Sequence, residues 1–247
     1  MSYLLIDDGN SRLKWTMAST TGQLSVVKQI PSDSKLETVW DGGEKPDAIF
    51  ISSVGSEKHK HDLINFFKNK WQISPSFICS SAKGFGVTNA YHQPERLGSD
   101  RWVAMIAAYH STQSAVLVVD AGTALTIDAI DNGGQHLGGI ISPGLGLSRT
   151  VLASGTNIDF DVADTISPNL FSQTTEQGIA SGTHYALTSL IDYAYRQLDE
   201  QFSNSASKPI CYLTGGNAEQ IKETLQCPYI YEPSLVLKGL ALIATGA

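Results

Sequence analysis

The sequence predicts an α/β protein of two halves, because one local pattern occurs twice and strand-like and helix-like segments alternate after each copy. In each copy an apolar run leads into an aspartate, a glycine turn and a small polar residue. The copies are Tyr3–Ile6 with Asp7-Asp8-Gly9-Asn10-Ser11, and Val116–Val119 with Asp120-Ala121-Gly122-Thr123-Ala124. Their separation is too long for a solenoid repeat and fits the duplication of a whole domain. We therefore predict an N-terminal half over residues 1–113 and a C-terminal half over residues 114–247.

Apolar spacing places the remaining elements. In the first half, strands are expected at 13–18, 23–30, 48–55 and 75–79, and helices at 60–71 and 100–112. In the second half, strands are expected at 115–119, 125–130, 135–142 and 210–214. Helices are expected there at 145–153, 175–201, 218–225 and 235–244.

Composition limits the possible functions. The 247 residues are 42% hydrophobic and 17% charged, as in soluble globular proteins. The net charge of −7 argues against nonspecific binding to nucleic acids or anionic membranes. Cys79, Cys211 and Cys227 are far apart and form no CxxC pair, which predicts neither a disulfide framework nor a zinc site and favours the cytoplasm. We expect no secretion signal and no membrane span.

The two aspartate-glycine turns have the chemistry of phosphate-binding loops. A glycine beyond a strand-end carboxylate lets the backbone approach an anion, and the next Asn, Ser or Thr can bond phosphate oxygens. The aspartate itself can hold the cation that accompanies a nucleotide. Gly215-Gly216, between a strand and a helix, leaves room for a base or ribose. Ordinary turns are the alternative for each motif taken alone.

Five motifs in order resemble the type III pantothenate kinase family, within the superfamily of acetate and sugar kinases, Hsp70 and actin. They are Asp7–Ser11 with Lys14-Trp15, Leu97–Trp102, Asp120–Ala124, Gly138–Gly144 and Thr214–Gly216. Ser11 stands where threonine is usual in the family and keeps the hydroxyl. The resemblance covers nearly the whole chain and implies two actin-like (ribonuclease H-like) halves. Each would have a mixed β-sheet with flanking helices, and a nucleotide cleft would lie between them.

The resemblance also implies an activity: ATP-dependent phosphorylation of the primary hydroxyl of pantothenate to 4'-phosphopantothenate, the first step of coenzyme A biosynthesis. The expected cofactors are ATP, Mg²⁺ and a monovalent cation, K⁺ or NH₄⁺. The expected assembly is a cytoplasmic homodimer with no membrane partner and no direct nucleic-acid binding.

The segment between the two copies carries the expected acceptor site. Asp100 is the predicted catalytic base, because it lies at the expected N-cap of a helix beside Arg101, which would keep its carboxylate ionised. Arg101 can pair with the substrate carboxylate. A plain N-cap aspartate beside a surface arginine is the alternative. The resemblance adds Tyr91, Gly98 and Ser99 as substrate contacts, and Thr175, or its neighbour Thr174, from the adjacent subunit.

The resemblance assigns the other positions to ATP and cations. Asp7 would hold the Mg²⁺–ATP complex and Asp120 the monovalent cation. The remaining ATP-binding positions are Asp8, Gly9, Asn10, Ser11, Arg12, Leu13, Lys14, Thr123, Gly215 and Gly216. The alternating charges of residues 57–62 are interpreted as a solvated helix start rather than a metal site.

Two other functions stay open at this point. The first is a non-catalytic regulator, since relatives have been called accessory factors for transcription and such a fold can act as a nucleotide-dependent switch. The acidic composition disfavours direct DNA contact. The second is a kinase or phosphatase for another small substrate, which Tyr91 and residues 98–101 disfavour through resemblance alone.

Overall fold

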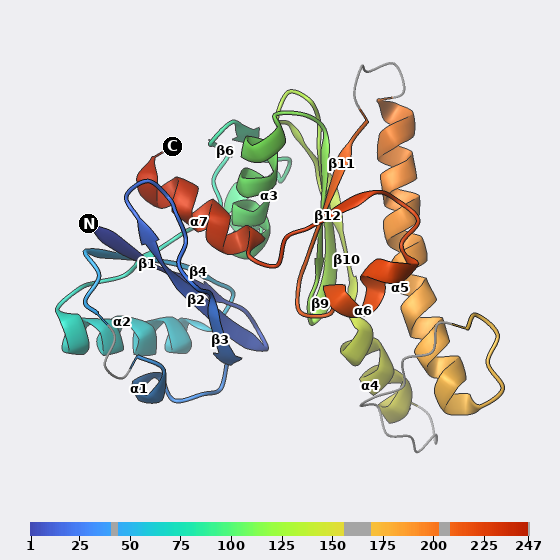
Figure 1. The fold of residues 1–247 in the computed structure, drawn as a ribbon, viewed down its shortest axis with the longest axis horizontal. Helices are drawn as coiled ribbons and strands as arrows, with labels where there is room; N and C mark the ends of the chain where they lie inside the picture. The colour runs from blue at the N-terminus through green and yellow to red at the C-terminus, as the bar shows by residue number, and fades with distance from the viewer. Residues whose placement is uncertain (41–43, 156–168, 203–207, 247) are drawn as a thin grey trace. The chain divides into compact units, whose positions relative to one another are not determined.

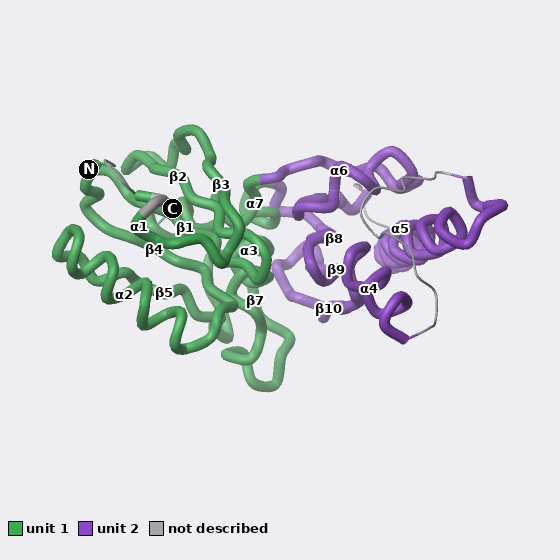
Figure 2. Tube along the Cα trace, turned by 90° about the horizontal axis from the view of Figure 1, so that it is seen from below, with its two compact units in different colours: residues 1–111, 234–247 green, residues 112–233 purple. Residues whose placement is uncertain are grey.

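The computed structural model describes residues 1–40, 44–155, 169–202 and 208–246. They form two compact units, shown in green and purple in Figure 2. Unit 1 is Met1–Ser111 with Ser234–Ala247, and unit 2 is Thr112–Pro233. The first boundary lies close to the predicted one. The last helix differs from the prediction, because the chain returns to unit 1 to complete it.

Unit 1 is built on a five-stranded mixed sheet (Figure 1). The order is β3 (Lys28–Pro31), β2 (Arg12–Ser19), β1 (Ser2–Asp8), β4 (Ala48–Ser53) and β5 (Ser76–Phe77). The first three strands are antiparallel, and β1, β4 and β5 are parallel. Its helices are α1 (Leu36–Val39), α2 (Glu57–Trp71), α3 (Ser99–Thr112) and α7 (Leu235–Thr245), with a small hairpin of β6 (Lys83–Gly84) and β7 (Val87–Thr88) and a 3-10 turn over Pro94–Arg96.

Both faces of this sheet are covered by helices. On one face α2 buries Leu63, Phe67 and Trp71 at helical spacing, against the β1 residues Leu4 and Ile6. On the other face α7 contacts β1, β2 and β4 (Figure 1). A Cβ at Gly239 of α7 would collide with the carbonyl oxygen of Val103 in α3, so the two helices meet at backbone distance. This packing explains why α7 belongs to unit 1.

Unit 2 repeats the same sheet topology. The order is β10 (His136–Pro143), β9 (Ala124–Ile130), β8 (Val116–Ala121), β11 (Ile210–Thr214) and β12 (Tyr229–Tyr231). Again the first three strands are antiparallel and the last two run parallel to β8. The repeated strand order confirms the duplication that the two sequence copies predict.

The helices of unit 2 bury one face of this sheet. They are α4 (Leu145–Gly155), α5 (Thr175–Gln201) and α6 (Ala218–Ile221), followed by a 3-10 turn over Lys222–Thr224. Leu187 and Ile191 of α5 pack with Leu117 of β8 and Ile127 of β9. Within the described residues, no helix combines the length and the apolar character that crossing a membrane requires.

Several predicted elements differ in extent, and the strand expected at 75–79 is only β5, Ser76–Phe77. The strand expected at 23–30 is reduced to β3 and a single bridge between Ala18 and Leu24. The helix expected at 218–225 breaks into α6 and a 3-10 turn. Helix α2 begins before residue 60, because the Ser56 hydroxyl accepts a bond from the amide of His59 and caps the helix at Glu57.

Candidate active site

The first phosphate turn joins β1 to β2. Asp7 pairs with Lys14 across the antiparallel ladder, so an acidic and a basic residue lie opposite each other next to the turn. The Gly9 amide donates to the carbonyl of Arg12 at 3.1 Å and closes the hairpin. Asp7 is half-buried, and a carboxylate at a strand end fits the ligand preference of Mg²⁺. The turn is therefore suited to hold a metal–phosphate group.

Residue Ser32, just after β3, supports the same turn. Its hydroxyl donates to the carbonyl of Asn10 at 2.8 Å, and its amide donates to the carbonyl of Ser11 at 3.1 Å. Because these bonds use the backbone carbonyls of the turn, the side chains of Asn10 and Ser11 stay exposed. Exposed amide and hydroxyl groups are the ones that can bond phosphate oxygens.

Asp8 lies in a different environment from Asp7. Its carboxylate is 2% exposed and contacts two side chains of unit 1. Ser53 Oγ donates to Oδ2 at 2.6 Å, and His59 Nε2 lies 3.1 Å from Oδ1. The alternating charges of residues 57–62 predicted a solvated helix start, so the contact of His59 with Asp8 was not expected. Only the tertiary structure, in which the end of β4 and the start of α2 lie beside the end of β1, reveals this partner.

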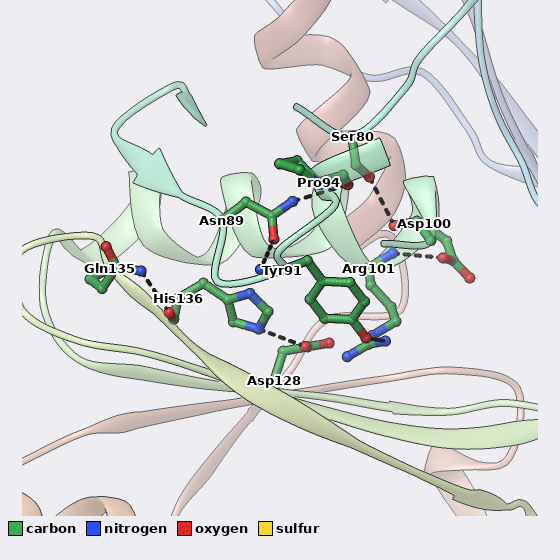
Figure 3. A network of polar contacts seen from close by, with 10 residues as sticks. Ser80, Asn89, Tyr91, Pro94, Asp100, Arg101, Asp128, Gln135 and His136 are labelled. Atoms are coloured by element: carbon green, nitrogen blue, oxygen red, sulfur yellow. Dashed lines mark hydrogen bonds and ion pairs between the residues drawn. The ribbon is translucent and has the colours of Figure 1, made fainter. Parts of the chain in front are cut away.

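The predicted acceptor loop leads into α3. The structure corrects one detail: α3 begins at Ser99, so Asp100 lies in the first helical turn and is not the N-cap. Its Oδ1 accepts from the amide of Arg101 at 2.7 Å (Figure 3). A Cβ at Gly98 would lie 2.6 Å from this same oxygen, so a larger residue there would displace the carboxylate from its present position. The Gly-x-Asp-Arg pattern therefore has a steric reason.

Tyr91 and Arg101 form one unit beside Asp100. The guanidinium donates to the Tyr91 hydroxyl at 2.9 Å and lies 5.8 Å from the centre of its ring (Figure 3). Asn89 fixes the tyrosine backbone by accepting from its amide at 3.0 Å. Arg101 is 7% exposed, and its guanidinium carries N–H donors in a planar fork that matches the two oxygens of a carboxylate. A buried cation with several donors is suited to bind a carboxylate.

Ser99 has an anchoring position. It is buried, and its hydroxyl lies 3.1 Å from Ser52 Oγ and donates to the carbonyl of Ser53 at 3.2 Å. These bonds fix the start of α3 to the end of β4. The structure thus shows Ser99 holding the loop, while its predicted contact with substrate stays a prediction.

The second phosphate turn joins β8 to β9 in unit 2. The Gly122 amide donates to the carbonyl of Ala124 at 3.1 Å, as Gly9 does to Arg12 in the first turn. Asn217, at the start of α6, donates from its side chain to the Gly122 carbonyl at 3.0 Å. The turn is thus bonded to the segment that follows β11. Thr123 is exposed at its tip.

Gly215 packs directly over the end of β8. Its φ is +101°, and a Cβ there would lie 2.5 Å from the amide nitrogen of Ala121 and collide with Oδ1 of Asp120. Asp120 pairs with Thr214 in the parallel ladder. The structure therefore brings Asp120, Gly122 and Gly215 together. Gly216 follows as an exposed residue. The Asp120 carboxylate is half-buried and has the oxygen chemistry that a hard cation would need.

Thr175 is the first residue of α5. Thr174 is the N-cap, and its hydroxyl accepts from the Gln177 amide at 3.2 Å. Thr175 lines an open groove of about 580 Å³ between α4 and α5, together with Val151 and Leu152. Because the Thr174 hydroxyl is used by the cap, Thr175 is the better candidate of the two for a contact with substrate.

A family model for type III pantothenate kinase matches residues 3–197, most of the chain. The chain belongs to the type III pantothenate kinase family. A curated family member from Nitrosomonas eutropha is 36% identical, with 98% of this chain and 95% of the relative covered. Another from Nitrosococcus oceani is 31% identical over 98% of this chain and 93% of the relative.

Solved structures show the same fold at lower identity. A Campylobacter jejuni protein described as a Baf family transcriptional activator has a TM-score of 0.60 at 23% identity, with 98% of each chain covered. A Clostridium difficile activator of 2-hydroxyisocaproyl-CoA dehydratase, solved with bound ADPNP, has a TM-score of 0.53 at 12% identity, over 100% of this chain and 95% of that one. Like these proteins, the type III pantothenate kinase described here has the predicted actin-like fold with two mixed sheets and flanking helices.

Proposed function

We propose that this chain transfers the γ-phosphoryl group of ATP to the primary hydroxyl of pantothenate, producing 4'-phosphopantothenate and ADP in the first step of coenzyme A biosynthesis. Membership of the type III pantothenate kinase family supports this substrate. The observation that carries it is the acceptor loop, where the Asp100 carboxylate follows Gly98 and the buried Arg101 bonds Tyr91. Pantothenate has a carboxylate and a primary alcohol, which match these two groups.

Asp100 acts as the base in this proposal. Its carboxylate accepts the hydroxyl proton as the alcohol oxygen forms its bond to the γ-phosphorus, while the bond to the β,γ-bridging oxygen breaks and ADP leaves. The short bond from the Arg101 amide favours the ionised carboxylate. Arg101 and Tyr91 orient the acceptor by its carboxylate.

The two turns hold the nucleotide and the cations. Asp7 binds Mg²⁺, and Asn10, Ser11 and Lys14 bond phosphate oxygens. When bound, Mg²⁺ neutralises the charge that develops on the transferring phosphoryl group. Asp120 binds a monovalent cation, K⁺ or NH₄⁺, beside Thr123. Gly215 and Gly216, at the end of β11, are the remaining nucleotide-binding positions in this proposal.

A homodimer is part of the proposal. Apolar side chains are exposed on neighbouring elements of unit 2, among them Ile141 of β10 at 63% and Val151 of α4 at 56%. Exposed apolar groups of this size are typical of a surface that another chain covers. Thr175 lines the groove beside Val151 and would reach the acceptor site of the second subunit. The cytoplasmic location stays a prediction.

A coupled assay of ADP formation tests the activity. Purified protein should consume ATP with pantothenate, Mg²⁺ and K⁺, and should not do so when pantothenate is replaced by alcohols without a carboxylate. ATP binding without turnover would contradict the proposal and favour the regulatory alternative.

The Asp100→Asn variant tests the base. It should lose about 1,000-fold in kcat, within the range of general base catalysis, and should keep its affinity for ATP. The isosteric amide preserves the space beside Gly98, so unfolding is not expected. Turnover near that of the natural protein would remove Asp100 from this role.

Mixed dimers test whether Thr175 acts across the interface. Asp100→Asn and Thr175→Ala subunits are each expected to be impaired, but a mixed dimer has one site with both residues intact. Mixing should restore roughly a quarter of the natural activity, because half of randomly assembled dimers are mixed and one of their two sites works. No restoration, with subunit exchange demonstrated, would place Thr175 outside the partner's site.

A further inference from the structure

We propose that Asp8 and His59 are positioning residues that hold the first phosphate turn from behind, rather than residues that contact the nucleotide. This inference rests on the proposed kinase activity, which assigns the turn to ATP. Successive residues of a strand point to opposite faces. Asp7 is half-buried at the turn, whereas the Asp8 carboxylate is 2% exposed on the other face of β1.

A buried carboxylate must be bonded, because an isolated one is costly. Asp8 receives the Ser53 hydroxyl at 2.6 Å and faces His59 Nε2 at 3.1 Å. An ionised carboxylate only accepts hydrogen bonds, so this nitrogen carries the proton. Ser53 ends β4 and His59 lies in the first turn of α2. One carboxylate thus joins the end of β1 to two other elements.

Close packing keeps this cluster in one arrangement. The Gly55 amide donates to Ser53 Oγ at 3.1 Å. A Cβ at Gly55 would lie 3.0 Å from Cδ2 of His59, 3.2 Å from Oδ2 of Asp8 and 3.3 Å from Oγ of Ser53. There is no space for the imidazole or the carboxylate to shift toward the β4–α2 connection. The backbone at Asp8, and with it the neighbouring Asp7, is therefore fixed.

The surroundings indicate that losing His59 would loosen the turn rather than unfold the protein. His59 and Ser32 both line an open hollow of about 870 Å³ between residues 32–37 and α2. The His59 side chain is 29% exposed. Water can therefore reach Asp8 when the imidazole is removed, so the fold survives while the restraint on β1 is lost.

Nucleotide affinity is the decisive measurement. ATP binding is followed by titration calorimetry with Mg²⁺ for the natural protein and for His59→Ala, His59→Gln and His61→Ala. His59→Ala should weaken ATP binding about 10-fold, equivalent to about 1.4 kcal/mol. His59→Gln should stay within about 2-fold of the natural protein, because its amide can donate to Asp8. His61, exposed on the same helix, is the matched control and should change nothing measurable.

A double-mutant cycle tests whether His59 acts through Asp8. Asp8→Ala should weaken ATP binding about as much as His59→Ala, and the double variant should be no weaker than Asp8→Ala, because coupled residues are not additive. In turnover, the KM for ATP should rise while the KM for pantothenate stays unchanged. A merely structural pair would not produce this split.

Unchanged ATP affinity in a folded His59→Ala variant would overturn the inference, even if its stability fell. If His59→Ala does not fold, Ser53→Ala loosens the same carboxylate and must show the same loss of ATP affinity. The proposed activity can fail separately. A protein that binds ATP but does not phosphorylate pantothenate would refute the activity, and the affinity comparison would still test the role of Asp8 and His59.

Discussion

The two phosphate turns have the same place in their sheets but are held differently. Asp7 and Asp120 are each the last residue but one of a central strand, and each pairs with a buried hydroxyl residue, Ser52 and Thr214, on the next parallel strand. At the next position unit 1 has the buried Asp8, bonded to side chains, whereas unit 2 has Ala121, packed against the backbone of Gly215. A repeated topology therefore does not require repeated chemistry.

This difference accompanies the separate roles that we propose for the two aspartates. In unit 1 a polar cluster holds Asp8 behind the turn, and Asn10 and Ser11 are exposed at the turn itself. In unit 2 the glycine backbone lies directly against the end of β8, and Asp120 lies beside it. Glycine at a positive φ lets the backbone at Gly215 lie directly beside the Asp120 carboxylate, which suits the proposed cation site. Variants at these positions test the difference between the two turns.

Gly215→Ala should have the largest effect. The new Cβ would overlap the Asp120 carboxylate and the backbone of Ala121, and alanine is disfavoured at a φ of +101°. We expect a loss of more than about 4 kcal/mol in the free energy of unfolding, measured by urea denaturation. Gly146→Ala, in α4 with open space at its Cβ position, is the control and should be nearly neutral. Equal stability of the two variants would contradict the packing of Gly215.

Ala121→Asp places the carboxylate of unit 1 at the equivalent position of unit 2. Ala121 is fully buried and has Gly215, not a serine, as its neighbour beyond β11. An unpaired buried carboxylate should cost about 3 kcal/mol of unfolding free energy. Ala121→Ser is the matched smaller change and should cost less. A stable Ala121→Asp variant would mean that unit 2 also accommodates a polar cluster.

Asp7→Asn and Asp120→Asn should affect different ligands. Asp7→Asn should lower kcat/KM for ATP roughly 100-fold, the scale of losing one preorganised charged contact. Asp120→Asn should raise the K⁺ concentration for half-maximal activity about 10-fold, because ligand charge sets cation affinity. Turnover rates measured while the Mg²⁺ concentration is varied, and then while the K⁺ concentration is varied, distinguish the two variants. The same response from both variants would argue against separate roles.

The smallest expected effect is a pH dependence in unit 2. Burial first, and then the nearby charge of Arg149, lower the pKa of His184 below its usual 6.5, and its Nε2 bonds the Thr224 hydroxyl. The unfolded state therefore binds the proton more readily than the folded state. The free energy of unfolding is therefore greatest above pH 6.5 and decreases as the pH falls below it, because protonation of His184 then favours the unfolded state. Urea unfolding at several pH values should show this decrease for the natural protein and not for the His184→Gln variant. If the unfolding free energies of the two proteins changed in parallel with pH, the prediction would be contradicted.

Local sequence signals predicted much of the fold and of the candidate site. Asp7–Ser11 and Asp120–Ala124 follow apolar runs, and both form strand-turn-strand hairpins in sheets of identical order. The Gly98–Arg101 pattern predicted that a helix starts at Asp100 and that the Asp100 carboxylate is the catalytic base. Helix α3 nevertheless begins at Ser99, because Ser99 bonds β4, which is distant in sequence. The alternating charges around His59 gave no indication of its contact with Asp8, because the two residues are far apart in the sequence.

By itself, the sequence determined the two turns, the acidic and hydroxyl residues at them, and the family, because these depend on residue type, short spacing and strand or helix periodicity. Tertiary structure alone decided that α7 completes unit 1, that Asp8 contacts Ser53 and His59, and that Gly215 packs over Ala121. These contacts join residues far apart in the chain. Only sheet register and helix packing bring them together, and no local pattern records either.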